Sequence, residues 1–342
     1  MLIEGILAAV PTPFYSDERV YLRKLEANIA HWSRSPLAGV LVMGSNGEAV
    51  HLNDEESEQV LKVAAEAAAP EKVMVAGANR ESADQVLRLA EAAARYGYDA
   101  VLVRTPVYYA AQMSRTAVET FFSAVADRSP LPVLLYNIPR SVPYNIPVEV
   151  VAELASHPNI LGIKDSAGDL EQIKRLIAAT RSAPKRTVTV TPTFESITGR
   201  MLKTKPQELV TVDGLAGGAS APALKTRTKE VGFQVLTGSA GILLEALEAG
   251  ASGAILGAAA FAPGACNEVY LAWKDHDRKL AAAKQERIAG AARRVVGELG
   301  IAAVKYACDY NGYYGGPPRL PLLPLTAAEK SEVETLLANI RS

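Results

Sequence analysis

Cysteine is scarce in this sequence, which has only Cys266 and Cys308 in 342 residues. A disulfide framework of the kind that holds small secreted domains together needs several cysteine pairs, so that class of protein is excluded. We expect both thiols to be buried as small apolar side chains in a reduced protein. Hydrophobic residues make up 49% of the chain, which is enough for a large core without covalent cross-links.

An excess of charge of one sign is also missing, because the formal net charge is −1. Neither a nucleic acid nor an anionic membrane is therefore expected as a partner. The first residues, MLIEGILAAVPTPF, have no basic segment before their short apolar run, and prolines end that run. They predict a first strand and neither a secretory signal nor a membrane span. The composition as a whole predicts a cytoplasmic protein.

Short apolar runs recur along the chain and are separated by longer segments. Runs without polar alternation are typical of strands that are buried on both faces, as in a parallel sheet covered by helices. The eight runs are residues 6–10, 39–43, 72–76, 100–103, 132–135, 160–163, 233–236 and 253–256.

The segments between the runs carry apolar residues at helical spacing. Val86, Leu89 and Ala90 show this spacing after Ser82, and a similar pattern follows Asn53, so both polar residues are candidate N-caps. Eight strands, each followed by a helix, predict an α/β fold, a closed (β/α)8 TIM barrel. A doubly wound nucleotide-binding sheet is the weaker alternative, because no GxGxxG sequence opens any of these helices.

Two regions interrupt this alternation. The barrel is predicted to occupy residues 1–262, with an insertion at about residues 182–232 between its sixth helix and its seventh strand. The insertion is rich in Thr, Lys, Pro and Gly. It should leave the barrel at the face opposite the loops that build active sites. Residues 263–342 are predicted to form a C-terminal helical extension, with helices at 271–299 and 329–340.

Catalytic side chains of such barrels project from the carboxyl ends of the strands, so polar residues at those ends are candidates for a site. We expect all of them to meet at one mouth of the barrel. They are residues 44–48 after the second strand, 105–109 after the fourth, Tyr136 and Asn137 at the fifth, 164–166 at the sixth and 237–239 at the seventh.

Lys164 and Tyr136 each end one of the apolar runs. Burial of an ammonium group costs free energy, so an apolar setting favours the neutral amine of Lys164, which can attack a carbonyl carbon. A phenol close to that amine can carry the protons that imine formation and carbon–carbon cleavage require. The alternatives are a structural lysine paired with a carboxylate such as Asp165, and a core tyrosine with a satisfied hydroxyl group.

The turn at residues 44–47 contains two polar side chains, Ser45 and Asn46, between two glycines. Side-chain donors and backbone N–H groups that point into a cleft are suited to binding a carboxylate. The alternative is an ordinary loop, because the same residue types are common in turns.

A metal-dependent lyase is the competing chemistry, and it would need two or three histidines or a cluster of carboxylates at the mouth. The chain has His31, His51, His157 and His276, and no two of them are spaced like a ligand pair. We therefore expect no metal site.

Three motifs, GSNGE at 44–48, YNIP at 136–139 and GIKD at 162–165, resemble the dihydrodipicolinate synthase and N-acetylneuraminate lyase superfamily. Its members are pyruvate-type class I aldolases on a (β/α)8 barrel. The resemblance covers nearly the whole chain outside the insertion. Within the superfamily, the sequence is most similar to mitochondrial-type 4-hydroxy-2-oxoglutarate aldolase, through HPNILGIKDSAGD at 157–169 and NGYYGGPPR at 311–319.

The resemblance implies a role for each matching residue. Lys164 matches the Schiff-base lysine, and Tyr136 matches the tyrosine that shuttles protons. Members of the superfamily form tetramers built as dimers of tight dimers and use no metal or organic cofactor, so a homo-oligomer, dimer or tetramer, without a cofactor is implied here. The further matches are Ser45 and Asn46, which hold the substrate carboxylate, Ser166 and Gly238, which contact substrate, and Tyr108, which reaches into a neighbouring subunit's site.

Two departures from the resemblance bear on the substrate. Dihydrodipicolinate synthases carry an arginine two residues after the proline of the YNxP motif, where this chain has Ser141, with Arg140 one position away. They also carry a Thr-Thr pair where Ser45 and Asn46 stand. Both differences argue against lysine biosynthesis as the function.

The sequence therefore predicts a lyase that splits a 4-hydroxy-2-oxo acid through an imine on Lys164. Its partner is expected to be a small-molecule 2-oxo acid, 4-hydroxy-2-oxoglutarate, which gives pyruvate and glyoxylate. A 2-keto-3-deoxy sugar acid aldolase and a 4-hydroxy-tetrahydrodipicolinate synthase are the alternative enzymes. A barrel that has lost catalysis and acts as a binding protein is the non-enzyme alternative, because a fold does not dictate a function.

Overall fold

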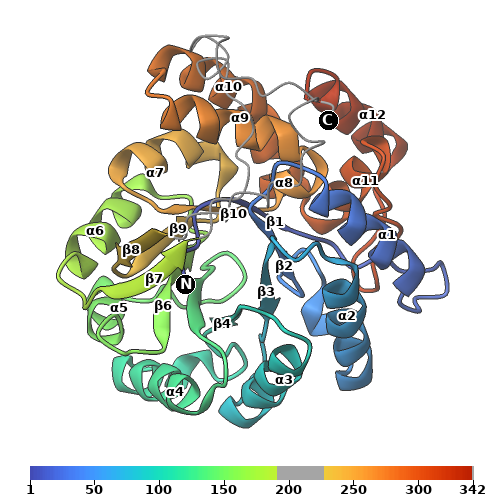
Figure 1. Cartoon of the computed structure of the whole chain (residues 1–342). Helices are drawn as coiled ribbons and strands as arrows, with labels where there is room; N and C mark the ends of the chain where they lie inside the picture. The colour runs from blue at the N-terminus through green and yellow to red at the C-terminus, as the bar shows by residue number, and fades with distance from the viewer. Residues whose placement is uncertain (191–226, 341–342) are drawn as a thin grey trace, which may run out of the picture.

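The computed structural model of the chain describes residues 1–190 and 227–340 (Figure 1). Eight parallel strands close into a barrel in the order β1-β10-β9-β6-β5-β4-β3-β2, so the predicted (β/α)8 fold is confirmed. The barrel strands are β1 (Gly5–Ala9), β2 (Gly39–Val42), β3 (Val73–Gly77), β4 (Ala100–Arg104), β5 (Val133–Asn137), β6 (Ile160–Asp165), β9 (Gln234–Thr237) and β10 (Gly253–Leu256).

Each barrel strand coincides with one of the eight apolar runs, because both of its faces are covered. One face fills the lumen of the barrel, where Leu7, Leu41, Leu102, Leu134 and Leu236 pack against one another. The opposite face packs under the surrounding helices and belongs to a larger cluster of buried side chains. A strand with two covered faces has no position for a polar side chain except at its ends.

The helices surround the barrel as an outer ring (Figure 1). The two predicted N-caps are confirmed: Asn53 accepts a hydrogen bond from the N–H of Glu56, and Ser82 accepts one from the N–H of Gln85. None of the described helices is long and apolar enough to cross a membrane. The helices up to the end of the barrel are α1 (Leu22–Ser33), α2 (Asp54–Ala67), α3 (Ala83–Arg95), α4 (Arg115–Arg128), α5 (Val148–Leu154), α6 (Leu170–Thr180), α7 (Leu243–Ala249) and α8 (Ala258–Phe261).

The C-terminal region is helical, as expected, but it is more divided than the sequence predicts. The expected helix at 271–299 is interrupted at 275–277, where His276 adopts a left-handed backbone conformation with φ of 58°. Helices α9 and α10 pack against α7, and α11 packs against α8. The elements are α9 (Pro263–Lys274), α10 (Arg278–Ala291), a π-helical segment (Ala292–Leu299), α11 (Ile301–Tyr310) and α12 (Ala327–Leu337).

The predicted insertion begins and ends as a two-stranded antiparallel ribbon, β7 (Arg186–Val190) with β8 (Arg227–Val231). The rest of the insertion, residues 191–226, lies outside the described residues. The guanidinium of Arg186 donates to the carbonyl oxygen of Ile160, at the amino end of β6. Lys229 pairs with Glu4, just before β1, at 3.1 Å. The ribbon therefore lies at the face of the barrel opposite the carboxyl ends of the strands.

Candidate active site

Lys164 and Tyr136 lie side by side at the carboxyl ends of two neighbouring strands. Tyr136 on β5 and Lys164 on β6 are direct partners in the parallel register. The Lys164 Nζ lies 4.5 Å from the centre of the Tyr136 ring. Only 4% of Lys164 and 2% of Tyr136 is exposed. The structure therefore brings together the amine and the phenol that the sequence singles out, and both are almost completely buried from solvent.

A β-bulge sets the direction of the Lys164 side chain. Val133 of β5 pairs with Ile160, but the next residue, Leu134, pairs with Gly162, so β6 carries one extra residue at this point. Side chains alternate along a strand, and an extra residue reverses the alternation beyond it. Because of the bulge, Lys164 shares the inward orientation of Tyr136.

Asp165 is not a partner of Lys164, which excludes the structural ion pair considered from the sequence. Its carboxylate accepts hydrogen bonds from the amides of Asn137 and Gln172, both at 2.7 Å. The N–H of Ala167 donates to its other oxygen at 3.1 Å. Burial raises the pKa of Asp165, and these hydrogen bonds offset only part of that effect. Among the described residues, no carboxylate pairs with Lys164.

Ser45 extends the pair of Lys164 and Tyr136 toward the mouth. Its hydroxyl shares a hydrogen bond of 3.2 Å with the hydroxyl of Tyr136. The side chain of Asn46 turns elsewhere, because its Nδ2 donates to the carbonyl oxygen of Ala9 at 3.1 Å. Ser45 is thus directed at the phenol, whereas the Asn46 amide is fastened to the end of β1.

Ser166 and Gly238 lie next to Lys164 on its other side. A methyl group added at residue 238 would collide with the Ser166 Oγ and would lie 3.1 Å from the Lys164 Cε. The N–H of Gly238 also donates to the carbonyl oxygen of Asp165 at 2.6 Å. Residue 238 therefore has to be a glycine so that the segments that follow β6 and β9 can lie side by side next to the lysine.

Tyr108 stands apart from this cluster. It is 80% exposed, and its ring meets that of Tyr109 edge to face, with 5.0 Å between the ring centres. Large exposed aromatic side chains are common at surfaces where proteins bind one another. Tyr108 also lies at the rim of the pocket described next.

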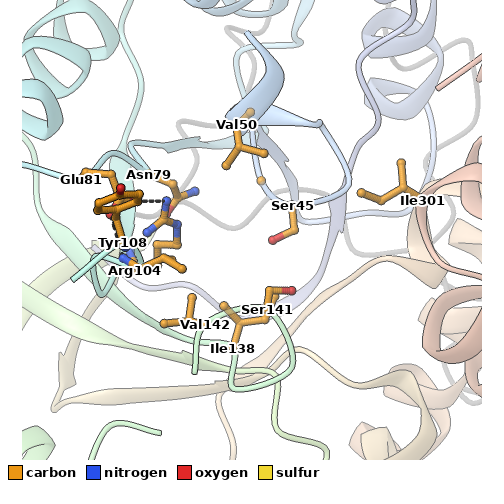
Figure 2. A pocket seen from close by; sticks show the side chains of 13 residues that line it. Ser45, Val50, Asn79, Glu81, Arg104, Tyr108, Ile138, Ser141, Val142 and Ile301 are labelled. Atoms are coloured by element: carbon orange, nitrogen blue, oxygen red, sulfur yellow. Dashed lines mark hydrogen bonds and ion pairs between the residues drawn. The ribbon is translucent and has the colours of Figure 1, made fainter. Parts of the chain in front are cut away.

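A pocket of about 490 Å³ opens above Ser45 (Figure 2). Lys164 and Tyr136 do not line the pocket, but the Tyr136 hydroxyl is hydrogen-bonded to Ser45, which does. Its walls come from the strand-end loops and from the first residue of α11. The lining residues are Gly44, Ser45, Ala49, Val50, Asn79, Glu81, Arg104, Val107, Tyr108, Ile138, Ser141, Val142 and Ile301.

The polar side of the pocket contains residues that the sequence analysis missed. Arg104, Glu81 and Asn79 lie together on one side, and Ser45 lies across the pocket from them (Figure 2). Arg104 is the last residue of β4 and ends an apolar run in the same way as Lys164 and Tyr136 do. The sequence shows the same signal at Arg104, but the sequence analysis places the polar residues after the fourth strand at 105–109, so it does not include Arg104.

A buried ion pair supports the loop that carries Ser45. Glu48 in this loop and Lys305 on α11 are both fully buried, with 2.6 Å between Oε1 and Nζ. Glu48 adopts a left-handed backbone conformation, with φ of 51°, which is uncommon for a residue other than glycine. Burial lowers the pKa of Lys305, and the Glu48 charge opposes this shift. The pair thus fixes a strained loop of the site to the C-terminal region.

We expect Lys305→Met to lower the free energy of unfolding by about 3–5 kcal/mol, because it leaves the Glu48 carboxylate buried without its cation. Replacing both partners, as Glu48→Gln with Lys305→Met, should restore much of that loss. Chemical denaturation of the purified variants measures both effects.

The matched control is Arg294→Met, since Arg294 makes ion pairs with Glu298 and Glu332 at the surface of the same region. Exposed pairs of this kind contribute at most about 1 kcal/mol. If Lys305→Met were no more harmful than Arg294→Met, the pair would have no structural role.

Among the described residues, the side chains of histidine, cysteine, aspartate and glutamate form no group of three or more that could hold a metal ion. Two histidines take part in local contacts instead. His51 lies 3.2 Å from Glu48, and His157 lies 3.0 Å from Asp127.

Comparison with known proteins points to one family. The family model described as the dihydrodipicolinate synthetase family matches residues 2–189 and 194–340. A dihydrodipicolinate synthase from Bacillus anthracis has a similar solved structure, with a TM-score of 0.80 and 23% identity, covering 100% of this chain and 100% of that one. At this identity the structural likeness supports the fold alone.

Three curated relatives are similar to this chain over nearly its whole length, but they have different names. A 4-hydroxy-tetrahydrodipicolinate synthase from Methanoculleus marisnigri is 29% identical, over 99% of this chain and 99% of its own. An L-threo-3-deoxy-hexylosonate aldolase from Hypocrea jecorina is 30% identical, over 96% and 93%. A probable mitochondrial 4-hydroxy-2-oxoglutarate aldolase from Emericella nidulans is 28% identical, over 97% and 93%. The three identities differ by no more than two percentage points, so sequence similarity does not favour one of the three activities over the others.

Proposed function

Because this chain belongs to the dihydrodipicolinate synthetase family, we propose that it is a class I aldolase that cleaves a 4-hydroxy-2-oxo acid through a Schiff base. The substrate is 4-hydroxy-2-oxoglutarate, and the products are pyruvate and glyoxylate. The observation that carries this proposal is the position of the Lys164 Nζ, 4.5 Å from the centre of the Tyr136 ring at the barrel mouth. The reaction uses no metal and no organic cofactor.

The first step is attack of the neutral Lys164 amine on the C2 ketone of the substrate. Lys164 is buried, and no carboxylate among the described residues pairs with it, so its Nζ can approach a carbonyl carbon without first leaving an ion pair. The amine adds to C2, and loss of water leaves a protonated imine. The C1 carboxylate lies near Ser45 and the backbone N–H groups of the 44–47 turn, with Asn46 holding the turn against β1.

The second step breaks the bond between C3 and C4. The C4 hydroxyl loses its proton, the C3–C4 electron pair moves toward the iminium nitrogen, and the aldehyde leaves. Protonation of the resulting enamine at C3 and hydrolysis of the imine release pyruvate and return the amine. The iminium group is the electron sink, so the protein has to supply only proton transfer and orientation.

Tyr136 carries the protons in this scheme. Its ring lies against the Lys164 Nζ, and its hydroxyl shares a hydrogen bond of 3.2 Å with the hydroxyl of Ser45, which lines the pocket. Ser166 and Gly238 shape the other side of the imine. Tyr108, which is exposed at the rim, completes the site of a neighbouring subunit in a dimer or tetramer.

Two other activities compete with this one, and each has an observation in its favour. Relatives named 4-hydroxy-tetrahydrodipicolinate synthase and L-threo-3-deoxy-hexylosonate aldolase are as similar to this chain as the one named 4-hydroxy-2-oxoglutarate aldolase. Against the synthase stand Ser141, in the place of its arginine, and Ser45 and Asn46, in the place of its Thr-Thr pair. The neighbouring Arg140 does not line the pocket and lies near Gly297 instead.

The proposal is tested by borohydride reduction of the protein with pyruvate, followed by mass spectrometry. An adduct on Lys164 is the expected result, whereas a folded protein without any adduct would favour the non-enzymatic alternative. A coupled assay of pyruvate release then ranks 4-hydroxy-2-oxoglutarate against a 2-keto-3-deoxy sugar acid. Condensation of pyruvate with aspartate semialdehyde, as the preferred reaction, would instead identify a synthase.

A further inference from the structure

Arg104 belongs to the same layer of inward-facing side chains as the proposed catalytic pair. It is the register partner of Tyr136, which in turn is the partner of Lys164. Leu102, two residues earlier on β4, packs inside the lumen, so Arg104 has the same inward orientation. Neighbouring strands are about 4.8 Å apart, so the Cα atoms of Arg104 and Lys164 are separated by about 10 Å. A substrate bound to Lys164 through C2 can therefore extend toward Arg104.

The guanidinium of Arg104 is held in place but is not saturated. It donates to the Glu81 carboxylate at 2.7 Å and to the carbonyl oxygen of Thr105 at 2.8 Å. An arginine has five N–H donors. Within residues 1–190 and 227–340, these are the two protein acceptors of the guanidinium, and the side chain lines the pocket. Arg104 can thus offer N–H groups to a ligand without losing its existing contacts.

The ion pair with Glu81 does not prevent Arg104 from donating hydrogen bonds to a ligand. Its Oε2 accepts hydrogen bonds from the N–H groups of Val107 and Tyr108, at 2.8 and 2.9 Å, and its Oε1 accepts the bond from Arg104. Burial acts to raise the pKa of Glu81, but these donors together keep it below its usual value. The carboxylate is therefore already occupied, and it serves to orient the guanidinium.

Asn79 adds a second donor to the same wall. Its Oδ1 accepts a hydrogen bond from the backbone N–H of Arg104 at 3.1 Å, which leaves the NH2 of its side-chain amide to donate to a ligand. Figure 2 shows both side chains on the same side of the pocket. A wall that presents donors matches a group that only accepts hydrogen bonds, such as a carboxylate. A chain of sugar hydroxyls would need acceptors as well.

We propose that Arg104 determines the substrate specificity of this site by binding the distal carboxylate of a dicarboxylic 4-hydroxy-2-oxo acid. This inference rests on the proposed function, because it assumes that the substrate is bound to Lys164. The planar guanidinium binds a carboxylate through two parallel N–H bonds, and Asn79 contributes a further donor. Arg104 thus supplies, from β4, the cation that the loop at Ser141 lacks.

The test compares 4-hydroxy-2-oxoglutarate with 4-hydroxy-2-oxopentanoate, which has a methyl group in place of the distal carboxylate. The wild-type protein should prefer the diacid by at least about tenfold in kcat/KM. Arg104→Met should lower kcat/KM for the diacid by roughly 10- to 100-fold, the value of a lost charge-assisted contact, and should change it little for the monoacid. Arg104→Lys keeps the positive charge but loses the planar guanidinium, so its kcat/KM for the diacid should lie between those of the wild type and Arg104→Met.

The matched control is Arg140→Met, at the same mouth but outside the pocket, which should stay within about twofold of the wild type on both substrates. The double variant Arg104→Met with Glu81→Gln avoids an unpaired carboxylate and should show the same selective loss. Equal losses on both substrates, no preference in the wild type, preference for a sugar acid, or a larger effect of Arg140→Met would each overturn the role of Arg104.

Pyruvate trapping separates this result from failure of the proposed function. Pyruvate has no distal carboxylate, so Arg104→Met should form the borohydride adduct as readily as the wild type. If the wild type forms the adduct but the two substrates respond alike to Arg104→Met, only the specificity inference is wrong. If the wild type forms no adduct, the aldolase proposal and the role of Arg104 both fail.

Discussion

Lys164→Ala is expected to abolish pyruvate release, with a fall in kcat/KM of more than about 10⁴-fold. The variant has no amine at the end of β6, so no imine can form and the electrons of the C3–C4 bond have no acceptor. The neighbouring Tyr136 ring and the Ser45 hydroxyl remain in place but cannot replace a nucleophile. The coupled assay of pyruvate release measures this loss, and the borohydride adduct should disappear with it.

Lys164→Arg is the control for a purely electrostatic role. A guanidinium keeps the positive charge but does not lose its proton in proteins, so it cannot form an imine. We expect this variant to be as inactive as the alanine variant. Circular dichroism and the melting temperature establish that both variants are folded. Turnover within tenfold of the wild type in either folded variant is incompatible with the Schiff-base role of Lys164.

Tyr136→Phe is expected to lower kcat by about 10²- to 10⁴-fold, the usual cost of losing a positioned proton carrier. The aromatic ring remains, so the packing 4.5 Å from the Lys164 Nζ is preserved and only the bond to Ser45 is lost. The imine with pyruvate should still form, although more slowly. Borohydride is therefore added at a series of times after pyruvate. An adduct that forms slowly but completely indicates slow proton transfer, whereas no adduct at any time indicates that the site is lost.

Tyr98→Phe is a matched control for the loss of a buried tyrosine hydroxyl. Tyr98 is 3% exposed and donates to the carbonyl oxygen of Leu61 at 3.0 Å, away from the barrel mouth. Its loss should lower the free energy of unfolding by about 1 kcal/mol and leave kcat unchanged. Near-normal turnover in Tyr136→Phe, or an equal fall in Tyr98→Phe, would contradict the assignment of the proton carrier.

Much of the fold could be predicted because each buried strand appears in the sequence as a short uninterrupted run of apolar residues. The family resemblance carried by three short motifs is confirmed by a match that covers residues 2–189 and 194–340. The N-caps at Asn53 and Ser82 were also predictable, since a cap is a contact between residues three positions apart. The start of α10 is capped in the same local way, because the side chain of Asp277 accepts a hydrogen bond from the N–H of Leu280, but the sequence analysis does not identify this cap.

The candidate site was predictable only where it follows from strand ends. Lys164 and Tyr136 could be found because each is a polar residue that ends an apolar run. Their contact depends on register and on the bulge at the start of β6, and neither is visible in the order of residues. Arg104 carried the same signal at the end of β4, yet its meaning appears only when the register places it beside Tyr136.

The eight strands, the helices between them and the types of chemical group at the barrel mouth can be predicted from the order of residues, because each depends on neighbours a few positions away. Which of those groups meet depends on how the folded chain brings distant residues together. Glu48 and Lys305 form a buried pair across 257 positions of the chain, and Arg104 faces a pocket partly closed by Ile301. Such contacts depend on barrel closure and on the packing of α11, and no local pattern of residues encodes them.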